Sequence, residues 1–306
     1  MITLVHASDI HFGKPHLAHV AEAFLESVRA VDPHALVVSG DLTQRAKAHE
    51  FQAAAAYLEM LAGTSPEGLP VVVTPGNHDV PVYRVFERLT DPYRNYRRHI
   101  SDELDTVTRI PGMTLVALNS TAPLRAIVNG RLDDHQLDFA RRAFGESPDH
   151  DVKVLVAHHH LAPAPDYEGD KPLPRAKEIL EALKEMGVEL VLGGHLHRGY
   201  IVNSLDVYPG EDRDHGVVVV HSGTTTSARG RARERLKNSF NIIHVAGDHL
   251  DITHHVFHPE DAVFRPLSRH LFPRRPLLSL PLEVAELRNG AAAAMAMDGS
   301  GAEAES

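Results

Sequence analysis

The chain of 306 residues has no cysteine, no long hydrophobic run and no excess of positive charge. Without cysteine there is neither a disulfide nor a thiolate ligand, so any bound metal must be held by His, Asp, Glu or Asn side chains. The same absence fits a reducing compartment. We therefore predict a cytoplasmic protein.

Membranes and nucleic acids are not the expected partners of this chain. No stretch approaches the roughly 18 consecutive apolar residues of a membrane-spanning helix, so we predict no membrane span. The N-terminal sequence MITLVHASDIHFG has no basic residues ahead of its short apolar run, which does not fit a signal peptide. The net charge is −10 with histidine neutral, whereas proteins that coat nucleic acid are usually basic.

An apolar content of 43% is enough for a substantial core, and the apolar residues fall into a regular order. Short apolar runs alternate with longer segments of helical periodicity, which predicts parallel strands joined by crossover helices. After residue 199, four apolar runs separated by turn residues predict antiparallel strands of a second sheet. The expected strands of the first sheet lie at 2–8, 35–41, 69–77, 113–120, 152–160 and from 188, and the expected helices at 17–31, 46–61, from 133 and at 174–187.

Polar side chains that can bind metal follow five of these strands. The carboxyl ends of parallel strands lie along one edge of a sheet, so we expect these side chains to converge there. Two pairs are spaced two residues apart, and in extended backbone such residues point to the same side. Each motif alone is common in surface turns, but their joint occurrence after successive strands indicates a site. The positions are Asp9, His11, Asp41, Asn77, His78, Asp79, His158, His159, His160, His195 and His197.

The order Asp-x-His, Gly-Asp, Gly-Asn-His-Asp, His and Gly-His-x-His resembles the calcineurin-like metallophosphoesterase superfamily. The match spans about residues 1–245. It implies an α/β fold, a four-layer αββα sandwich of two mixed β-sheets flanked by helices. The stretches SDIHFG, GDLTQRA, TPGNHDVP and SGTTTS further resemble bacterial class III 3',5'-cyclic nucleotide phosphodiesterases, a branch close to glycerophosphodiester phosphodiesterases.

The resemblance implies two divalent or trivalent transition-metal ions with a shared ligand. Asp41 would be a ligand of both ions. In the run of three histidines, the ligand would be His158, with His159 as the alternative. Carboxylate, amide and imidazole ligands suit Fe, Mn or Zn without selecting among them. One ion would be held by Asp9, His11, Asp41 and His197, and the other by Asp41, Asn77, His158 and His195.

Such a pair of ions suits phosphoryl transfer. A water that bridges both ions becomes a hydroxide near neutral pH and is expected to attack phosphorus in line. Asn77 adds no negative charge, so the site stays attractive to an anion. We expect His78 to contact the phosphate or protonate the leaving group, with Asp79 orienting it. The alternative is that His78 only caps or packs the loop.

We therefore predict a dinuclear-metal phosphodiesterase that hydrolyses small phosphodiesters, with 3',5'-cyclic nucleotides as the first candidate substrates. One alternative is a broad-specificity phosphodiesterase or phosphatase acting, for example, on glycerophosphodiesters. A nuclease is another, and the acidic net charge speaks against it. A non-catalytic scaffold of the same fold should show broken ligand motifs, and the motifs here are intact.

The C-terminal part and an arginine-rich segment complete the sequence. We expect residues 1–258 to form the catalytic domain and residues 259–306 an extension whose low-complexity end is disordered. Apolar pieces of this extension pack either on the core or on a second subunit, which leaves a homodimer open. The segment SARGRARERLK, from Ser227, either steers phosphate or forms a solvated, salt-bridged surface.

Overall fold

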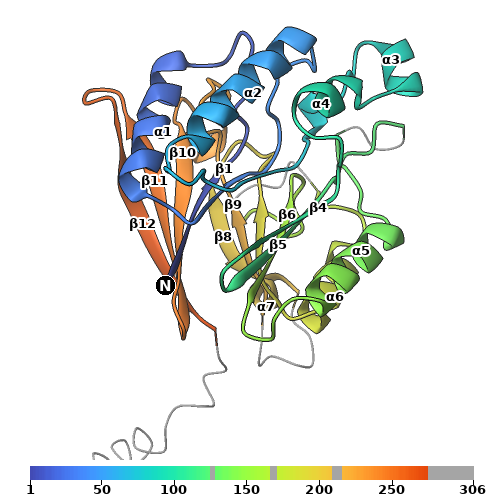
Figure 1. Cartoon of the computed structure of the whole chain (residues 1–306), viewed down its shortest axis with the longest axis vertical. Helices are drawn as coiled ribbons and strands as arrows, with labels where there is room; N and C mark the ends of the chain where they lie inside the picture. The colour runs from blue at the N-terminus through green and yellow to red at the C-terminus, as the bar shows by residue number, and fades with distance from the viewer. Residues whose placement is uncertain (125–127, 166–170, 209–215, 275–306) are drawn as a thin grey trace, which may run out of the picture.

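The computed structural model describes residues 1–124, 128–165, 171–208 and 216–274. Two six-stranded sheets lie face to face, and helices cover their outer faces (Figure 1). This four-layer arrangement confirms the predicted fold class. None of the helices within these residues is long and apolar enough to cross a membrane.

The first sheet has the strand order β12-β11-β10-β1-β2-β3. The helices α1 (Ala18–Val31) and α2 (Ala48–Ala62) join its three parallel strands, as the alternating pattern predicts. The other three strands run antiparallel to their neighbours. The strands are β1 (Ile2–Ala7), β2 (Ala35–Val38), β3 (Val71–Val73), β10 (Ser239–Val245), β11 (His249–His258) and β12 (Val263–Pro273).

The second sheet has the order β4-β5-β6-β7-β9-β8, with four parallel central strands and an antiparallel strand at each edge. Its helices are α5 (Asp134–Gly145) and α6 (Ala176–Glu185). Three short helices lie in connections: α3 (Val85–Thr90), α4 (Arg94–His99) and α7 (Ser204–Val207). The strands are β4 (Thr106–Ile110), β5 (Met113–Leu118), β6 (Val152–Ala157), β7 (Val188–Gly193), β8 (Tyr200–Asn203) and β9 (Val218–His221).

The predicted division of strands between the sheets is wrong. The pattern of apolar runs groups β5, β6 and β7 with the first three strands, and β8 to β11 together in a second sheet. Instead β5, β6 and β7 share their sheet with β8 and β9, while β10 returns to pair with β1. An apolar run indicates a strand but not its partner, because the partner is chosen by contacts far apart in the sequence.

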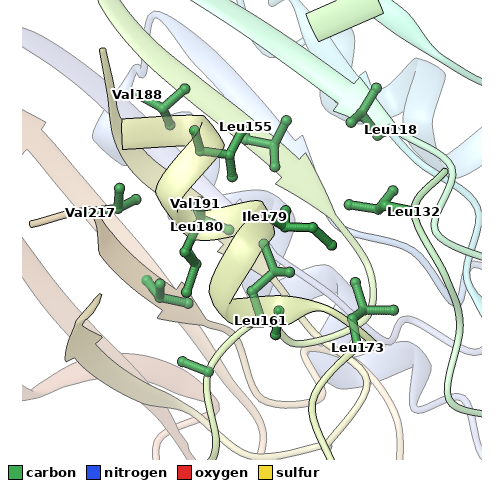
Figure 2. Packing of buried hydrophobic residues seen from close by; sticks show 14 of the residues in the cluster. Leu118, Leu132, Leu155, Leu161, Leu173, Ile179, Leu180, Val188, Val191 and Val217 are labelled. Atoms are coloured by element: carbon green, nitrogen blue, oxygen red, sulfur yellow. The ribbon is translucent and has the colours of Figure 1, made fainter. Parts of the chain in front are cut away.

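Three apolar clusters separate the four layers. Alternate residues of a strand face opposite sides, so Val154 and Val156 of β6 pack between the sheets whereas Leu155 packs under α6. Figure 2 shows Ile179 and Leu180 of α6 in this outer cluster. A third cluster lies between the first sheet and the helices α1 and α2. Strands buried on both faces explain the nearly continuous apolar runs.

The C-terminal extension contributes a strand to the first sheet. The domain boundary expected at residue 258 stays a prediction, and β12, which lies beyond it, pairs with β11 from His258 and Val263 to His249 and Pro273. The expected disorder of the chain end concerns residues 275–306, which lie outside the described residues.

Candidate metal centre

The predicted ligands from both sheets meet where the loops leave β1, β2, β3, β6 and β7. Asp9, His11, Asp41 and His197 each offer a ligand atom, and these atoms lie within 4.8 Å of one another. All four side chains are buried. A buried group of carboxylates and imidazoles in this geometry is able to hold a metal ion.

These residues lie in left-handed backbone and not in extended strands, which corrects the reasoning from their two-residue spacing. β1 ends at Ala7 and β7 at Gly193, ahead of the ligands. Non-glycine residues at positive φ are uncommon, cost roughly 1–3 kcal/mol each and cluster at functional sites. The φ values are 55° for Asp9, 51° for His11, 55° for Asp41, 75° for His195 and 54° for His197.

Two imidazoles direct their Nε2 atoms at each other. His11 donates from Nδ1 to the carbonyl of Thr43 (3.2 Å), and His197 donates from Nδ1 to the carbonyl of Arg229 (3.1 Å). A carbonyl only accepts, so each neutral ring carries its hydrogen on Nδ1 and a lone pair on Nε2. The two Nε2 atoms are 3.1 Å apart. Facing lone pairs are favourable when a cation lies between them, which is the usual reason for this second hydrogen bond in metal-binding histidines.

The two carboxylates each leave one buried oxygen without a hydrogen-bond donor among the described residues. These oxygens are Asp9 Oδ1 and Asp41 Oδ2. The other oxygens accept backbone N–H groups, Asp9 Oδ2 from His195 (3.0 Å) and Asp41 Oδ1 from His78 (2.8 Å). Because a buried carboxylate oxygen without a donor is costly, these two positions fit metal ligands.

A second group of predicted ligands adjoins the first at Asp41. His158 Nε2 lies 3.4 Å from Asp41 Oδ2 and 3.2 Å from Asn77 Oδ1, and His195 Nδ1 lies 2.9 Å from the same Asn77 oxygen. Asp41 Oδ2 is also 3.6 Å from His11 Nε2 in the first group. One oxygen therefore faces both groups, as a bridging ligand would.

The rings of His158 and His159, the two candidates for this position, have different hydrogen-bond partners. His158 donates from Nδ1 to the Ser39 carbonyl (2.7 Å), which leaves Nε2 for the site. His159 instead places Nδ1 2.8 Å from the hydroxyl of Ser120. Burial is the largest cause that lowers the pKa of His159, and this pKa lies well below its usual value.

Two of the histidines at the site are in the protonation state that binds metal, and a third, His158, is not. Burial lowers the pKa of His11 to about 4, and burial with the charge of His158 lowers that of His195 to about 3. Both rings are thus neutral at pH 7, the form that binds metal. Burial also acts to lower the pKa of His158, but the Asp41 and Asp9 carboxylates and the hydrogen bond to the Ser39 carbonyl together outweigh it and raise this pKa to about 9. A cation must displace that proton, so binding at His158 strengthens as the pH rises.

The structure gives Asp79 a different partner from the one expected. Its carboxylate accepts hydrogen bonds from the backbone N–H groups of Leu42, Thr43 and Gly76, at 2.8–3.1 Å, and from the Thr43 hydroxyl at 2.9 Å. The His78 ring is oriented instead by the Gln44 carbonyl, 2.9 Å from Nδ1. Asp79 therefore ties the loop after β3 to the loop after β2. Burial and the neighbouring Asp41 carboxylate raise the pKa of Asp79, and the backbone donors oppose that rise.

The positions of Gln44 and Arg229 beside the site are not predicted by their residue types. Both contribute a backbone carbonyl that fixes a histidine ring. Every residue has a carbonyl, so no sequence pattern signals this role. The sequence points to them only by position, since Gln44 lies in the GDLTQRA stretch and Arg229 in the arginine-rich segment.

We expect Gly76→Ala to lower metal affinity strongly while the chain still folds. A Cβ atom at Gly76 would overlap both the carboxylate and the backbone nitrogen of Asp41. The new methyl group must displace Asp41, whose oxygen faces both ligand groups. Metal content after dialysis, measured by atomic emission, should fall well below that of the wild type.

Gly145→Ala is the matched control, since a Cβ atom there meets nothing within 4 Å. It ends α5, and its metal content should equal that of the wild type. Full metal content in Gly76→Ala would contradict the placement of Asp41.

Comparison with known proteins agrees with this geometry. The family model for calcineurin-like phosphoesterases matches residues 2–199. The 3',5'-cyclic adenosine monophosphate phosphodiesterase CpdA of Haemophilus influenzae is 27% identical over 165 residues, which cover 53% of this chain and 54% of that protein. The CpdA of Escherichia coli K12 is 24% identical over 208 residues, 64% of this chain and 70% of that protein. The match thus spans about half the length of the first relative.

Solved structures share the fold at low sequence identity. The purple acid phosphatase PPD1 of yellow lupin (Lupinus luteus) superposes with a TM-score of 0.66 at 12% identity, over 89% of this chain and 53% of that one. PhoD superposes with a TM-score of 0.60 at 12% identity, over 87% and 71%. The family model covers well over half of the chain, and the chain belongs to the calcineurin-like phosphoesterase family.

Proposed function

We propose that this phosphoesterase is a dinuclear-metal phosphodiesterase that hydrolyses small phosphodiesters, with 3',5'-cyclic nucleotides as the first candidate substrates. The observation that carries the proposal is the position of Asp41 Oδ2, a buried oxygen that faces His11 Nε2 at 3.6 Å and His158 Nε2 at 3.4 Å. A carboxylate oxygen between two ligand groups is the feature a two-metal site requires.

We assign the ligands in two sets that share Asp41. Neutral imidazoles, carboxylates without donors and the Asn77 amide form a donor set suited to Fe, Mn or Zn. When bound, such ions supply charge that neutralises phosphate oxygens and lowers the pKa of a nearby water. The sets are Asp9, His11, Asp41 and His197 for one ion, and Asp41, Asn77, His158 and His195 for the other.

His78 is the residue assigned to the leaving group. Its Nδ1 donates to the Gln44 carbonyl, so Nε2 is the atom left to face a phosphate or a departing oxygen, and it donates a proton there when the ring is in its protonated form. Its ring lies 4.9 Å from the His11 ring, centroid to centroid, and its side chain is only half-buried. His78 thus combines contact with the site and access from solvent, as a proton donor needs. Asp79 does not contact the leaving group and instead positions the loop that carries His78.

The cyclic nucleotide part of the proposal is supported by the CpdA relatives, which act on 3',5'-cyclic adenosine monophosphate by name. Seven residues with suitable side chains in the two sets speak against a non-catalytic scaffold. A broad-specificity phosphodiesterase or phosphatase uses the same site and differs only in what surrounds it.

A substrate panel on protein reconstituted with Mn²⁺, Fe²⁺ or Zn²⁺ tests the proposal. It compares cyclic AMP, cyclic GMP, bis-p-nitrophenyl phosphate, p-nitrophenyl phosphate and single-stranded DNA by kcat/KM. We expect the diesters, cyclic nucleotides included, to exceed the monoester. If no diester is hydrolysed with any of these metals, the proposal fails. A strong preference for the monoester would make the chain a phosphatase.

A further inference from the structure

A strongly basic pocket lies beside the metal centre, between the loops after β1, β2 and β9 and the start of α2. Its volume is about 410 Å³. Four cationic side chains line it, those of Lys14, Arg45, Lys47 and Arg229, against a single carboxylate, Glu50. We call it the basic pocket. Its charge stands out in a chain whose net charge is −10.

Two residues belong both to the basic pocket and to the surroundings of the metal centre. Arg229 holds His197 through its carbonyl (3.1 Å), and Gln44, which also lines the pocket, holds His78 through its carbonyl (2.9 Å). The Arg229 guanidinium donates to the Gln44 amide oxygen (2.9 Å) and joins the two segments. The pocket is therefore one residue layer away from the predicted ligands.

The basic pocket and the metal centre share a wall, because the residues whose backbone carbonyls fix the rings of His197 and His78 also line the pocket. The geometry supports one extended ligand that occupies both places.

The cations of the pocket are available for a ligand. Lys14, Arg45 and Lys47 form no ion pair with any residue in the described part of the chain. The Glu50 carboxylate accepts hydrogen bonds from the backbone N–H groups of Arg45 (2.8 Å) and Lys47 (3.2 Å) at the start of α2, and, among the described residues, it forms no ion pair with the cations of the pocket. With four cations against this one carboxylate, the pocket keeps an excess of positive charge that favours an anion.

We propose that the basic pocket binds a second phosphate group of the substrate while the phosphodiester lies at the metal centre. The substrates favoured by the pocket are then, among the diesters of the proposed function, nucleotide-like diesters that carry a further phosphate monoester. A simple 3',5'-cyclic nucleotide has a single negative charge at its diester and leaves the pocket unused. This inference rests on the proposed function for the chemistry, but the binding of the second phosphate is independent of turnover.

Two chromogenic esters differ only in that group. Thymidine 5'-(p-nitrophenyl phosphate) has the diester alone, and its 3'-phosphorylated form adds a phosphate monoester. For metal-loaded wild type we expect kcat/KM to be at least about tenfold higher for the phosphorylated ester, since two close charge pairs at partial exposure supply that much. The variant Arg45→Gln/Lys47→Gln should lose this preference and keep its rate on the simpler ester within about twofold.

The control variant is Arg141→Gln/Lys177→Gln, which removes the same two charges from exposed positions on α5 and α6. It should retain the wild-type preference. Equal loss in both variants would mean a general charge effect and would overturn the proposal. Absence of any preference in the wild type would overturn it as well.

Calorimetric binding separates this proposal from the proposed function. Thymidine 3',5'-bisphosphate and thymidine 5'-monophosphate are titrated into the same metal-loaded proteins. The bisphosphate should bind at least about tenfold more tightly to wild type and to the control, and without advantage to Arg45→Gln/Lys47→Gln. If this holds while neither ester is hydrolysed, the pocket stands and the proposed function fails. Equal affinity of the wild type for both nucleotides would refute the proposal that the basic pocket binds a second phosphate.

Discussion

Asp41→Asn should lower kcat/KM for bis-p-nitrophenyl phosphate by about a thousandfold or more and reduce the bound metal to one equivalent or less. The substitution keeps the size of the side chain and removes its charge. The affected oxygen faces both ligand groups, so neither keeps a full ligand set. Metal ions contribute several kcal/mol to phosphoryl transfer, and each 1.4 kcal/mol is about tenfold in rate. Atomic emission and steady-state kinetics on the same preparation measure both effects.

Asp151→Asn is the matched control for this substitution. Asp151 is also buried and accepts a hydrogen bond from Thr114 (2.9 Å), but it lies at the start of β6, at the opposite end of the strand from His158. Its metal content and kcat/KM should stay near those of the wild type. Two full equivalents of metal in Asp41→Asn would refute the role of Asp41 as the shared ligand.

His78→Ala should lower kcat by about 10²- to 10⁴-fold and leave the metal content intact. His78 belongs to neither ligand set, and a positioned proton donor contributes about this much to turnover. The loss should shrink for a substrate with a good leaving group, such as p-nitrophenolate, because that group needs no proton. Comparing kcat for cyclic AMP and for bis-p-nitrophenyl phosphate in wild type and variant measures this difference.

His244→Ala is the control for the loss of a half-buried histidine. His244 lies on β10 and contacts the Thr3 hydroxyl through Nδ1 (3.0 Å), away from the predicted ligands. Its kcat should be unchanged. Loss of both metals in His78→Ala would refute the proposed role, since His78 would then be needed to hold the site together.

Most of the candidate site was predictable from the sequence because metal binding depends on a few types of side chain. Carboxylates, imidazoles and an amide after successive apolar runs indicated a metal site, and the ligand atoms of Asp9, His11, Asp41 and His197 do lie together. The prediction that these side chains converge at the strand ends is correct, but the prediction that extended backbone orients them is wrong. Strand ends do meet, but the side chains are aimed by left-handed backbone at Asp9, His11 and Asp41. Asp and His adopt positive φ more often than most non-glycine residues, but it is uncommon even for them, so residue type alone does not predict it at these positions.

The roles of Asp79 and Gln44 show a second limit. The sequence places Asp79 beside His78, which suggested a direct contact. In the fold, Asp79 instead accepts N–H groups from the loop after β2, and Gln44 from that loop orients His78. Neighbours in sequence often point apart in a tight turn, whereas loops from adjacent parallel strands meet at the same sheet edge.

The sequence by itself determined the set of potential ligands and, through the resemblance that their motifs carry, the family and the four-layer fold class. The motifs depend on residue types in a fixed order along the chain. Only the tertiary structure decided which strands share a sheet, which oxygen faces both ligand groups and where Lys14, Arg45, Lys47 and Arg229 gather. These depend on contacts between segments far apart in the sequence, such as Arg229 with Gln44, 185 residues away, and such contacts form only when the chain has folded.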